Sequence, residues 1–331
     1  MKRILVTGAC GSIGEELVSK LIRDGFKVCA FDNSEDRLFH LNKKFNKHKN
    51  SENLRVFLGD IRDKNRLFQA MQGIEEIYHC AALKHVELSE YNPFEALKTN
   101  VIGTNNLIEV AQENKVKKIL FTSSDKAVNP SSMMGTTKLL GEKLAISANN
   151  YTGSDDIKFG CVRFGNVWNT NGSVGPIFKN QINLNKDLTL TNKLMSRFFI
   201  TKEEAVNLCI NACNSLIGGE IFVPDMGVAK LGDIADEFNK YNKKIKIKEI
   251  GAQAGEKFYE ELFTEIEGDR AYRYKGMYVI LPENIDNKST RYIKLLKVYK
   301  KGKPVSIALR SDSPLNKKVN IKKLVKELMH E

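Results

Sequence analysis

Three adjacent residues, Ser124-Asp125-Lys126, place a hydroxyl, a carboxyl and an ammonium group directly after a short apolar run. A carboxyl group beside an amine can donate and remove protons if both face one reacting molecule. Burial would favour the neutral form of each group, whereas their mutual attraction would favour the charged forms, so the sequence leaves the balance open. A thioether, Met134, and a second amine, Lys138, follow on a predicted helix. We take these residues as the candidate catalytic group.

A glycine-rich turn at residues 8–14 lies between a short apolar run and the start of an amphipathic helix. Glycines permit positive φ and the close approach of a phosphate, and the unpaired N–H groups at a helix start hold negative charge. A second apolar run ends at Asp32, whose carboxylate can accept hydrogen bonds from an adenosine ribose. The pattern predicts a bound nicotinamide dinucleotide whose pyrophosphate contacts Gly8, Cys10, Gly11, Ser12, Ile13 and Gly14.

The identity of the dinucleotide depends on two side chains. Asp32 repels a 2′-phosphate and favours NAD, whereas Arg37 could partner a phosphate and leaves NADP open. Further cofactor contacts are expected after the third and fourth predicted strands. Asp60 and Ile61 follow the third strand, near the adenine, and the small residues Ala81 and Ala82 follow the fourth, where the backbone must pass close to the cofactor.

These groups need a scaffold that brings them together. Short apolar runs alternate with amphipathic helical stretches up to about residue 165, which predicts an α/β fold with a Rossmann-like, doubly wound parallel sheet. Ligands of such sheets lie beyond the carboxyl ends of the strands. We therefore expect a dinucleotide-binding domain at 1–165. A smaller α/β substrate-binding region is expected at 166–331, with some of its elements interleaved with the first domain.

Composition limits the classes of protein to consider. The chain has 331 residues, 42% of them hydrophobic, which is enough for a sizeable core. No apolar run approaches the roughly 20 residues of a membrane span, and the N-terminus lacks a cleavage-site pattern. The sequence thus predicts a soluble, cytoplasmic protein that does not associate with a membrane.

Charge and cysteine content argue against nucleic acids and metals as ligands. The net charge of +12 comes from lysines spread along the chain, without a basic stripe of interleaved aromatic residues, so a solvated surface that could steer an anionic substrate is favoured. Of the six cysteines, Cys209 and Cys213 alone have metal-ligand spacing, and no histidine lies nearby. Buried free thiols are the preferred interpretation, and no metal site is expected.

The motifs together resemble a known superfamily. The turn at 7–14, Ser124 and Lys138 match the extended short-chain dehydrogenases/reductases, except that Met134 occupies the position of the usual tyrosine. The stretches 124–130 and 134–138 resemble the UDP-N-acetylglucosamine 4,6-dehydratases of polysaccharide biosynthesis, some of which carry methionine there, in their short, soluble form. The resemblance continues through residues 81–86, 99–104, 163–167, 172–174, 196–198, 255–262 and 310–312. Gln253 departs from the arginine usual in the family.

The resemblance implies a reaction and a role for each catalytic residue. NAD would take a hydride from C4 of the sugar and return it to C6 after water has left across C5–C6, so the cofactor would stay tightly bound and be recycled. Lys126 would remove the C5 proton, Asp125 would protonate the leaving C6 hydroxyl, and Ser124 would bind the C4 oxygen. Lys138 would hold the nicotinamide ribose, and Met134 would lie where the sugar ring passes.

The resemblance also implies ligand contacts elsewhere in the chain. Arg197 is the expected partner of the substrate diphosphate or uridine, and Lys84 and Asn100 are added to the cofactor contacts. The expected substrate contacts are Lys84, His85, Glu87, Asn166, Val174, Arg197 and Glu256. His79 is interpreted as structural. A homo-oligomer that binds a UDP-sugar is implied.

Two other functions stay open at this stage. A nucleotide-sugar 4-epimerase shares the fold and cofactor, but it does not need the Asp125-Lys126 pair. A non-catalytic, dinucleotide-binding regulatory protein would explain Met134, but not the intact Ser124, Asp125, Lys126 and Lys138. The sugar, the nucleotide, the configuration at C5 and the base for the C4 hydroxyl, Asp125 or Lys126, are also left open.

Overall fold

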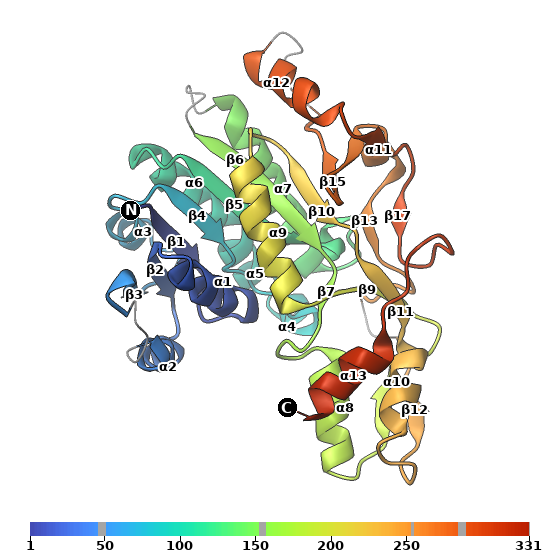
Figure 1. The fold of residues 1–331 in the computed structure, drawn as a ribbon. Helices are drawn as coiled ribbons and strands as arrows, with labels where there is room; N and C mark the ends of the chain where they lie inside the picture. The colour runs from blue at the N-terminus through green and yellow to red at the C-terminus, as the bar shows by residue number, and fades with distance from the viewer. Residues whose placement is uncertain (46–50, 152–156, 253–254, 284–288, 331) are drawn as a thin grey trace.

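The computed structural model describes residues 1–45, 51–151, 157–252, 255–283 and 289–330, so the departure at Gln253 lies outside the described residues. A ten-stranded sheet runs through the molecule in the order β16-β14-β15-β10-β6-β5-β4-β1-β2-β3 (Figure 1). From β3 to β10 neighbouring strands are parallel, and beyond β10 they are antiparallel. The predicted doubly wound parallel sheet is therefore confirmed, with an antiparallel extension at one edge.

The strands of this sheet combine elements from both halves of the chain. They are β1 (Arg3–Thr7), β2 (Lys27–Asp32), β3 (Leu54–Leu58), β4 (Glu76–His79), β5 (Lys118–Ser124), β6 (Lys158–Phe164), β10 (Ile221–Pro224), β14 (Ala271–Tyr274), β15 (Met277–Ile280) and β16 (Lys303–Pro304). The last four follow residue 165, so the second half of the chain completes the large sheet. The division into two domains at residue 165 stays a prediction.

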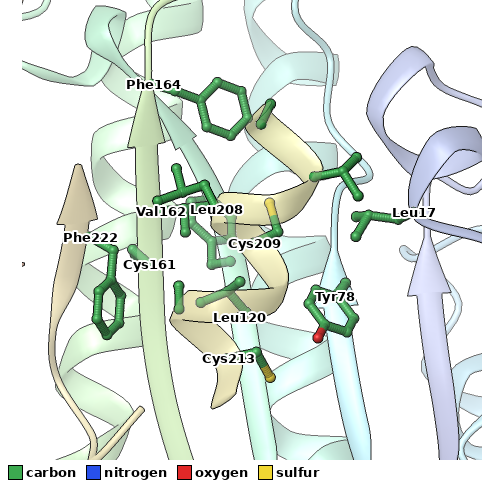
Figure 2. Close-up of a cluster of buried hydrophobic side chains, with 14 of the residues drawn as sticks. Leu17, Tyr78, Leu120, Cys161, Val162, Phe164, Leu208, Cys209, Cys213 and Phe222 are labelled. Atoms are coloured by element: carbon green, nitrogen blue, oxygen red, sulfur yellow. The ribbon is translucent and has the colours of Figure 1, made fainter. Parts of the chain in front are cut away.

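Helices cover both faces of the sheet, which is why its strands are apolar on both sides. One face carries α1 (Ser12–Arg23), α2 (Glu35–Phe45) and α9 (Lys202–Ser215), and the other carries α3 (Lys64–Ala70), α6 (Gly103–Glu113) and α7 (Met133–Tyr151). Figure 2 shows Leu208, Cys209 and Cys213 of α9 lying over Leu120 of β5 and Val162 of β6. All six cysteines are free.

A second, smaller core lies beside the carboxyl end of the large sheet (Figure 1). Trp168, Phe178, Phe199 and Phe238 pack there. Its elements are β7 (Asn166–Val167), α8 (Val174–Asn183), β8 (Leu188–Leu190), β9 (Ser196–Ile200), β11 (Gly227–Lys230), α10 (Leu231–Asn239), β12 (Ile247–Glu249) and α13 (Ile321–His330).

Short elements connect these layers. They are η1 (Ser51–Asn53), α4 (Val86–Tyr91), α5 (Pro93–Leu97), the π-helix η2 (Lys98–Ile102), the 3₁₀ turn η3 (Asp125–Ala127), β13 (Glu261–Phe263), α11 (Glu265–Gly268), α12 (Thr290–Tyr299) and β17 (Leu309–Arg310). The antiparallel pair β13–β17 joins two segments of the second half. Within the described ranges, no helix combines the length and the apolar content that crossing a membrane requires.

Candidate active site

The glycine turn is built by close backbone contacts. Gly8 has a φ of +66°, and a Cβ there would lie 2.6 Å from the amide nitrogen of Ala81. A Cβ on Gly14 would lie 2.1 Å from the Gly8 carbonyl oxygen, which also accepts a hydrogen bond from Gly11 at 3.0 Å. No side chain caps α1, so the amides around Ser12 and Ile13 are available to an anion. The turn thus fits the pyrophosphate of a dinucleotide.

Asp32 is held in place at the end of β2 by the turn itself. One carboxylate oxygen accepts the Cys10 amide at 2.9 Å, and the other accepts the Ser34 amide at 3.0 Å. Burial, followed by the nearby Asp32 charge, raises the pKa of the Cys10 thiol to about 12, so this thiol stays protonated at neutral pH. Arg37 lies exposed on α2, and its charge acts on both Cys10 and Lys84.

The next two expected cofactor contacts have competing partners. Arg62 donates to Asp60 through Nε at 3.0 Å and Nη2 at 2.7 Å. Burial raises the pKa of Asp60, but the hydrogen bonds from Arg62 outweigh it and leave the pKa below its usual value. The side chain of Ile61 is buried, and a Cβ on Gly103 would lie 2.8 Å from its Cδ1. Ile61 therefore packs in the core, and an adenine would have to share Asp60 with Arg62.

Asn100 supports the loop after β4, in which Ala81 and Ala82 are half-buried. Its amide oxygen accepts from the Leu83 amide at 2.8 Å, and its nitrogen donates to the Leu83 carbonyl and to Thr137 Oγ1, each at 3.0 Å. The side chain uses both of its donors in these bonds and is 1% exposed. Asn100 thus fixes the position of the loop beside the glycine turn.

Two buried basic residues lie between the glycine turn and β5. His79 hydrogen-bonds through Nδ1 to Thr7 at 2.7 Å and through Nε2 to Thr104 at 3.1 Å. Burial, followed by the charge of Lys138, lowers the pKa of His79 to about 3, so the ring is neutral and structural, as the sequence predicts. Lys138 donates to the Thr122 carbonyl at 2.6 Å, and burial lowers its pKa to about 8. Two further donors of its ammonium group are left for a ligand.

The end of β5 places an acid beside a base. Ser124 Oγ accepts the Lys126 amide at 3.2 Å and donates to Asp125 Oδ1 at 2.7 Å. Lys126 Nζ lies 3.1 Å from the same Oδ1. Asp125 is fully buried, and its Oδ2 has no hydrogen-bond partner. The predicted trio is therefore in direct contact, with one carboxylate oxygen left over.

The helix α7 is pressed against this trio. A Cβ on Gly135 would lie 2.3 Å from the Lys126 carbonyl oxygen, so only glycine permits this approach. Met134, in the preceding position, is 3% exposed. The thioether is therefore buried at the start of α7, and it can neither donate nor accept a proton in a reaction.

Residues from three further segments surround Lys126. Asn166 Oδ1 lies 3.4 Å and Glu260 Oε1 lies 3.6 Å from Lys126 Nζ, and Arg197 Nε lies 3.8 Å from the same Glu260 oxygen. Burial lowers the pKa of Lys126, but the attraction of Asp125 and Glu260 outweighs it and raises the pKa. We refer to Asp125, Lys126, Asn166, Arg197 and Glu260 as the charged cluster.

Glu260 is the member of the charged cluster that the sequence analysis missed. The sequence motif indicates Glu256 of the same stretch, whereas the structure brings Glu260 to Lys126. The stretch offers three carboxylates, Glu256, Glu260 and Glu261, and no pattern in the sequence says which of them faces Lys126. Glu256 is half-buried in the preceding turn.

The segment after residue 254 is fastened to the loop that follows Lys126. Lys257 Nζ donates to the Val128 carbonyl at 2.7 Å, Ser131 Oγ donates to the Gly255 carbonyl at 2.8 Å, and Asn129 donates to Glu261 at 2.7 Å. Nearby, the buried Arg163 pairs with Glu142 of α7 and Glu267 of α11 at 2.5 and 3.0 Å. These contacts fix the distance between Glu260 and Lys126.

The remaining predicted substrate contacts lie at two loop-to-helix junctions, before α4 and before α8. Lys84 Nζ donates to the Asn171 carbonyl at 2.9 Å, and a Cβ on Gly172 would lie 3.2 Å from His85 Cε1. Partial burial, followed by the charge of Arg37, lowers the pKa of Lys84. Val174 begins α8 just beyond this contact, and Glu87 is exposed on the first turn of α4. Lys84, His85 and the start of α8 are thus brought together.

Arg197 is buried beside Glu260. It is 5% exposed, and its Nη1 donates to the carbonyls of Ser196 at 2.9 Å and Phe258 at 3.4 Å. Its charge faces Glu260. A role as a diphosphate partner stays a prediction. Among the described residues, no group of histidine, cysteine or acidic side chains is arranged to hold a metal ion.

Comparison with known proteins relates the chain to several nucleotide-sugar enzymes. An uncharacterized membrane protein of Methanocaldococcus jannaschii is 43% identical over 99% of this chain and 96% of its own length. The inverting UDP-N-acetylglucosamine 4,6-dehydratase of Campylobacter jejuni is 37% identical over 85% of this chain and 83% of its own. The UDP-glucose 4-epimerase of Rickettsia bellii is 35% identical over 99% and 95%, respectively.

A solved structure and a family model extend the similarity over most of the chain. The X-ray structure of Pen from Bacillus thuringiensis matches with a TM-score of 0.88 and 37% identity, covering 100% of this chain and 98% of that one. The model of the family described as polysaccharide biosynthesis protein matches residues 4–282. The chain therefore belongs to the polysaccharide biosynthesis protein family, of the extended short-chain dehydrogenase/reductase type.

Proposed function

We propose that this protein is a nucleotide-sugar 4,6-dehydratase that uses NAD and converts UDP-N-acetylglucosamine to its 4-keto-6-deoxy derivative. One observation carries the proposal: Lys126 and Asp125 share a hydrogen bond of 3.1 Å at the end of β5, and Asp125 Oδ2 is buried without a partner. Elimination of water needs such an acid and base side by side. The relative of Campylobacter jejuni that bears this activity in its name supports the proposal.

The chain offers a fitting place for NAD. The turn at 8–14 would hold the pyrophosphate, Asp32 would accept from the adenosine ribose, and Lys138 would donate to the nicotinamide ribose. Bound NAD would supply the hydride chemistry, accepting a hydride from C4 of the sugar and returning it to C6. Two backbone amides hold the charge of Asp32 where a 2′-phosphate would lie, which favours NAD over NADP. The exposed Arg37 is the residue that could reverse this preference.

The first proton to move is that of the C4 hydroxyl, and Met134 cannot accept it. Ser124 Oγ already donates to Asp125 Oδ1 at 2.7 Å. A C4 hydroxyl bound to Ser124 would pass its proton through Ser124 to Asp125. Asp125 would then hold the proton that the C6 hydroxyl needs in order to leave as water. This route supplies both proton transfers without a tyrosine.

The second proton to move is that of C5, which becomes acidic beside the C4 ketone. Lys126, whose side chain is 28% exposed, carries the amine that would remove it. An ammonium group has no lone pair, so Lys126 must first be neutral. The attraction of two carboxylates opposes this, and the release of the Lys126 proton is therefore the step that the site must assist.

Incubation with UDP-N-acetylglucosamine tests the proposal. We expect a product lighter by one water by mass spectrometry, and turnover reduced by about a hundredfold or more in Lys126→Ala and in Asp125→Asn. Lys143 is exposed on the outer face of α7, so Lys143→Ala is the control and should match the wild type. If the protein binds NAD but forms no such product from UDP-hexoses, the proposal is wrong and a regulatory dinucleotide-binding role gains support.

A 4-epimerase is the second candidate, favoured by the 35% identity to the Rickettsia bellii protein named as UDP-glucose 4-epimerase. Simple epimerisation at C4 moves no proton at C5, so it leaves the Asp125-Lys126 pair without a task. The same incubation separates the two, because an epimer has the mass of the substrate.

A further inference from the structure

The backbone of Glu260 is held by Ser311, in addition to the contacts that fasten its segment to the loop after Lys126. Its amide donates to Ser311 Oγ at 2.9 Å, and its carbonyl accepts the Ser311 amide at 2.8 Å. Ser311 Oγ also lies 2.8 Å from Ser196 Oγ, and both serines are buried. Two segments distant in sequence from Glu260 therefore fix its backbone, and the side chain extends toward Lys126.

The side chain of Glu260 is buried but incompletely paired. It is 3% exposed, its Oε1 faces Lys126 at 3.6 Å and Arg197 at 3.8 Å, and its Oε2 has no hydrogen-bond partner. A carboxylate with few hydrogen bonds in a buried site binds a proton more readily. Burial, with the negative charge of Asp125, raises the pKa of Glu260 although Lys126, Arg197 and Lys257 oppose the shift.

We propose that Glu260 is a positioning residue that takes up the proton which Lys126 must release before it can act as a base. The inference rests on the proposed dehydratase function. An N–H bond of Lys126 Nζ breaks and an O–H bond forms on the Glu260 carboxylate, 3.6 Å away. Lys126 then has a lone pair for the C5 proton, while Asp125 stays free to carry the proton of the C4 hydroxyl.

The transfer leaves the net charge of the buried site unchanged. Before it, Lys126 and Arg197 are positive while Asp125 and Glu260 are negative; after it, Arg197 and Asp125 carry one charge each. The net charge is zero in both states, so no charge has to be brought into or out of a poorly solvated region. C5 regains one proton for each that it loses, so Glu260 can return its proton at the end of a cycle.

The proposal predicts a distinct pH dependence. In the wild type the proton moves within the charged cluster, so turnover should be nearly independent of pH around neutrality. In Glu260→Gln, Lys126 must lose its proton to solvent, so turnover should fall at pH 7 and rise about tenfold per pH unit below the pKa of Lys126. A purely electrostatic role predicts the opposite, because removing a negative charge lowers the pKa of Lys126 and raises the rate at pH 7.

The experiment measures kcat from pH 6 to 9 and solvent-deuterium exchange at C5 for the wild type, Glu260→Gln, Glu260→Asp and the exposed control Glu265→Gln. We expect the pH slope in Glu260→Gln alone, with Glu260→Asp restoring the flat profile at a lower rate. A Glu260→Gln profile parallel to the wild type, or a higher rate at pH 7, overturns the proposal. If Glu260→Gln does not fold, a sloping profile in Glu260→Asp overturns it as well. A wild type that forms no dehydrated product refutes the proposed function instead.

Discussion

The glycine turn and the charged cluster lie at the carboxyl end of the same sheet, but they are built in opposite ways. The turn is local: Gly8, Gly11 and Gly14 lie close together within one strand–helix connection, and the loop after β4 and the end of β2 contact it. The charged cluster draws Lys126, Asn166, Arg197 and Glu260 from segments far apart in the chain. A binding site for a common cofactor can therefore be encoded in a short motif, whereas the acid–base chemistry depends on the tertiary fold.

The largest expected effect on the cofactor site comes from adding one methyl group to the turn at Gly8. Gly8→Ala should lower the free energy of unfolding by about 1–2 kcal/mol because of its left-handed φ. It should also lower NAD affinity by about tenfold or more, because the new Cβ displaces the Ala81 backbone. Gly25→Ala is the matched control: Gly25 has a φ of +85° but no atom within 4 Å of its Cβ position.

Calorimetric titration with NAD and chemical denaturation measure the two effects. Gly25→Ala should show the loss of stability without the loss of affinity. Equal NAD affinity in both variants would mean that the turn does not hold the cofactor.

A second test concerns Lys138, the buried amine between the glycine turn and β5. Burial lowers the pKa of Lys138 to about 8, whereas the unfolded chain keeps a value of about 10.4. Between these values the unfolded state binds more protons, so the stability of the native state should rise with pH, by about 1.4 kcal/mol per unit. Lys138→Met should lack this rise. Denaturation at pH 8, 9 and 10 measures the free energy of unfolding of the two proteins. If it changes with pH equally in both, the lowered pKa of Lys138 is contradicted.

The smallest expected effect on turnover comes from Ser311, which holds the backbone of Glu260. Ser311→Ala removes the hydroxyl that accepts the Glu260 amide and contacts Ser196. We expect a loss of about 1–2 kcal/mol in stability, because a buried amide loses its partner, and a few-fold fall in kcat. Ser313→Ala, which removes a hydroxyl that accepts a weak hydrogen bond from Leu315 at 3.4 Å, should leave kcat unchanged. An equal kcat in both variants would show that the backbone of Glu260 is fixed without Ser311.

The contrast between a local turn and a cluster assembled by the tertiary fold explains what the sequence could predict. Strands such as β2 and β5 and the turn at 8–14 follow from local patterns of apolar residues and glycines, and the structure confirms them. The role of Asn100 could not be read from its motif, because its hydrogen bonds to Leu83 and Thr137 depend on packing between helices. Glu260 was missed for the same reason: a motif identifies a stretch of chain, but only tertiary contacts decide which of its carboxylates faces Lys126.

The residues of the second half were the harder part to predict. β14 and β16 extend the large sheet through antiparallel pairs, for which the alternating strand–helix pattern of the first half gives no signal. A buried ionic network joins the two halves: Arg163 and Glu142 lie in the first and Glu267 in the second, and no short motif contains all three. Their contacts nevertheless set the position of α7 relative to β6 and α11, and thereby that of Lys138.

In the proposed reaction, one bound cofactor and one acid–base cluster remove water from a single sugar. UDP-N-acetylglucosamine carrying deuterium at C4 tests it most directly, with the product analysed by mass spectrometry and NMR. We expect a 4-keto-6-deoxy product that has lost one water and carries the deuterium at C6. A product of unchanged mass epimerised at C4, or a dehydrated product without deuterium at C6, would contradict it.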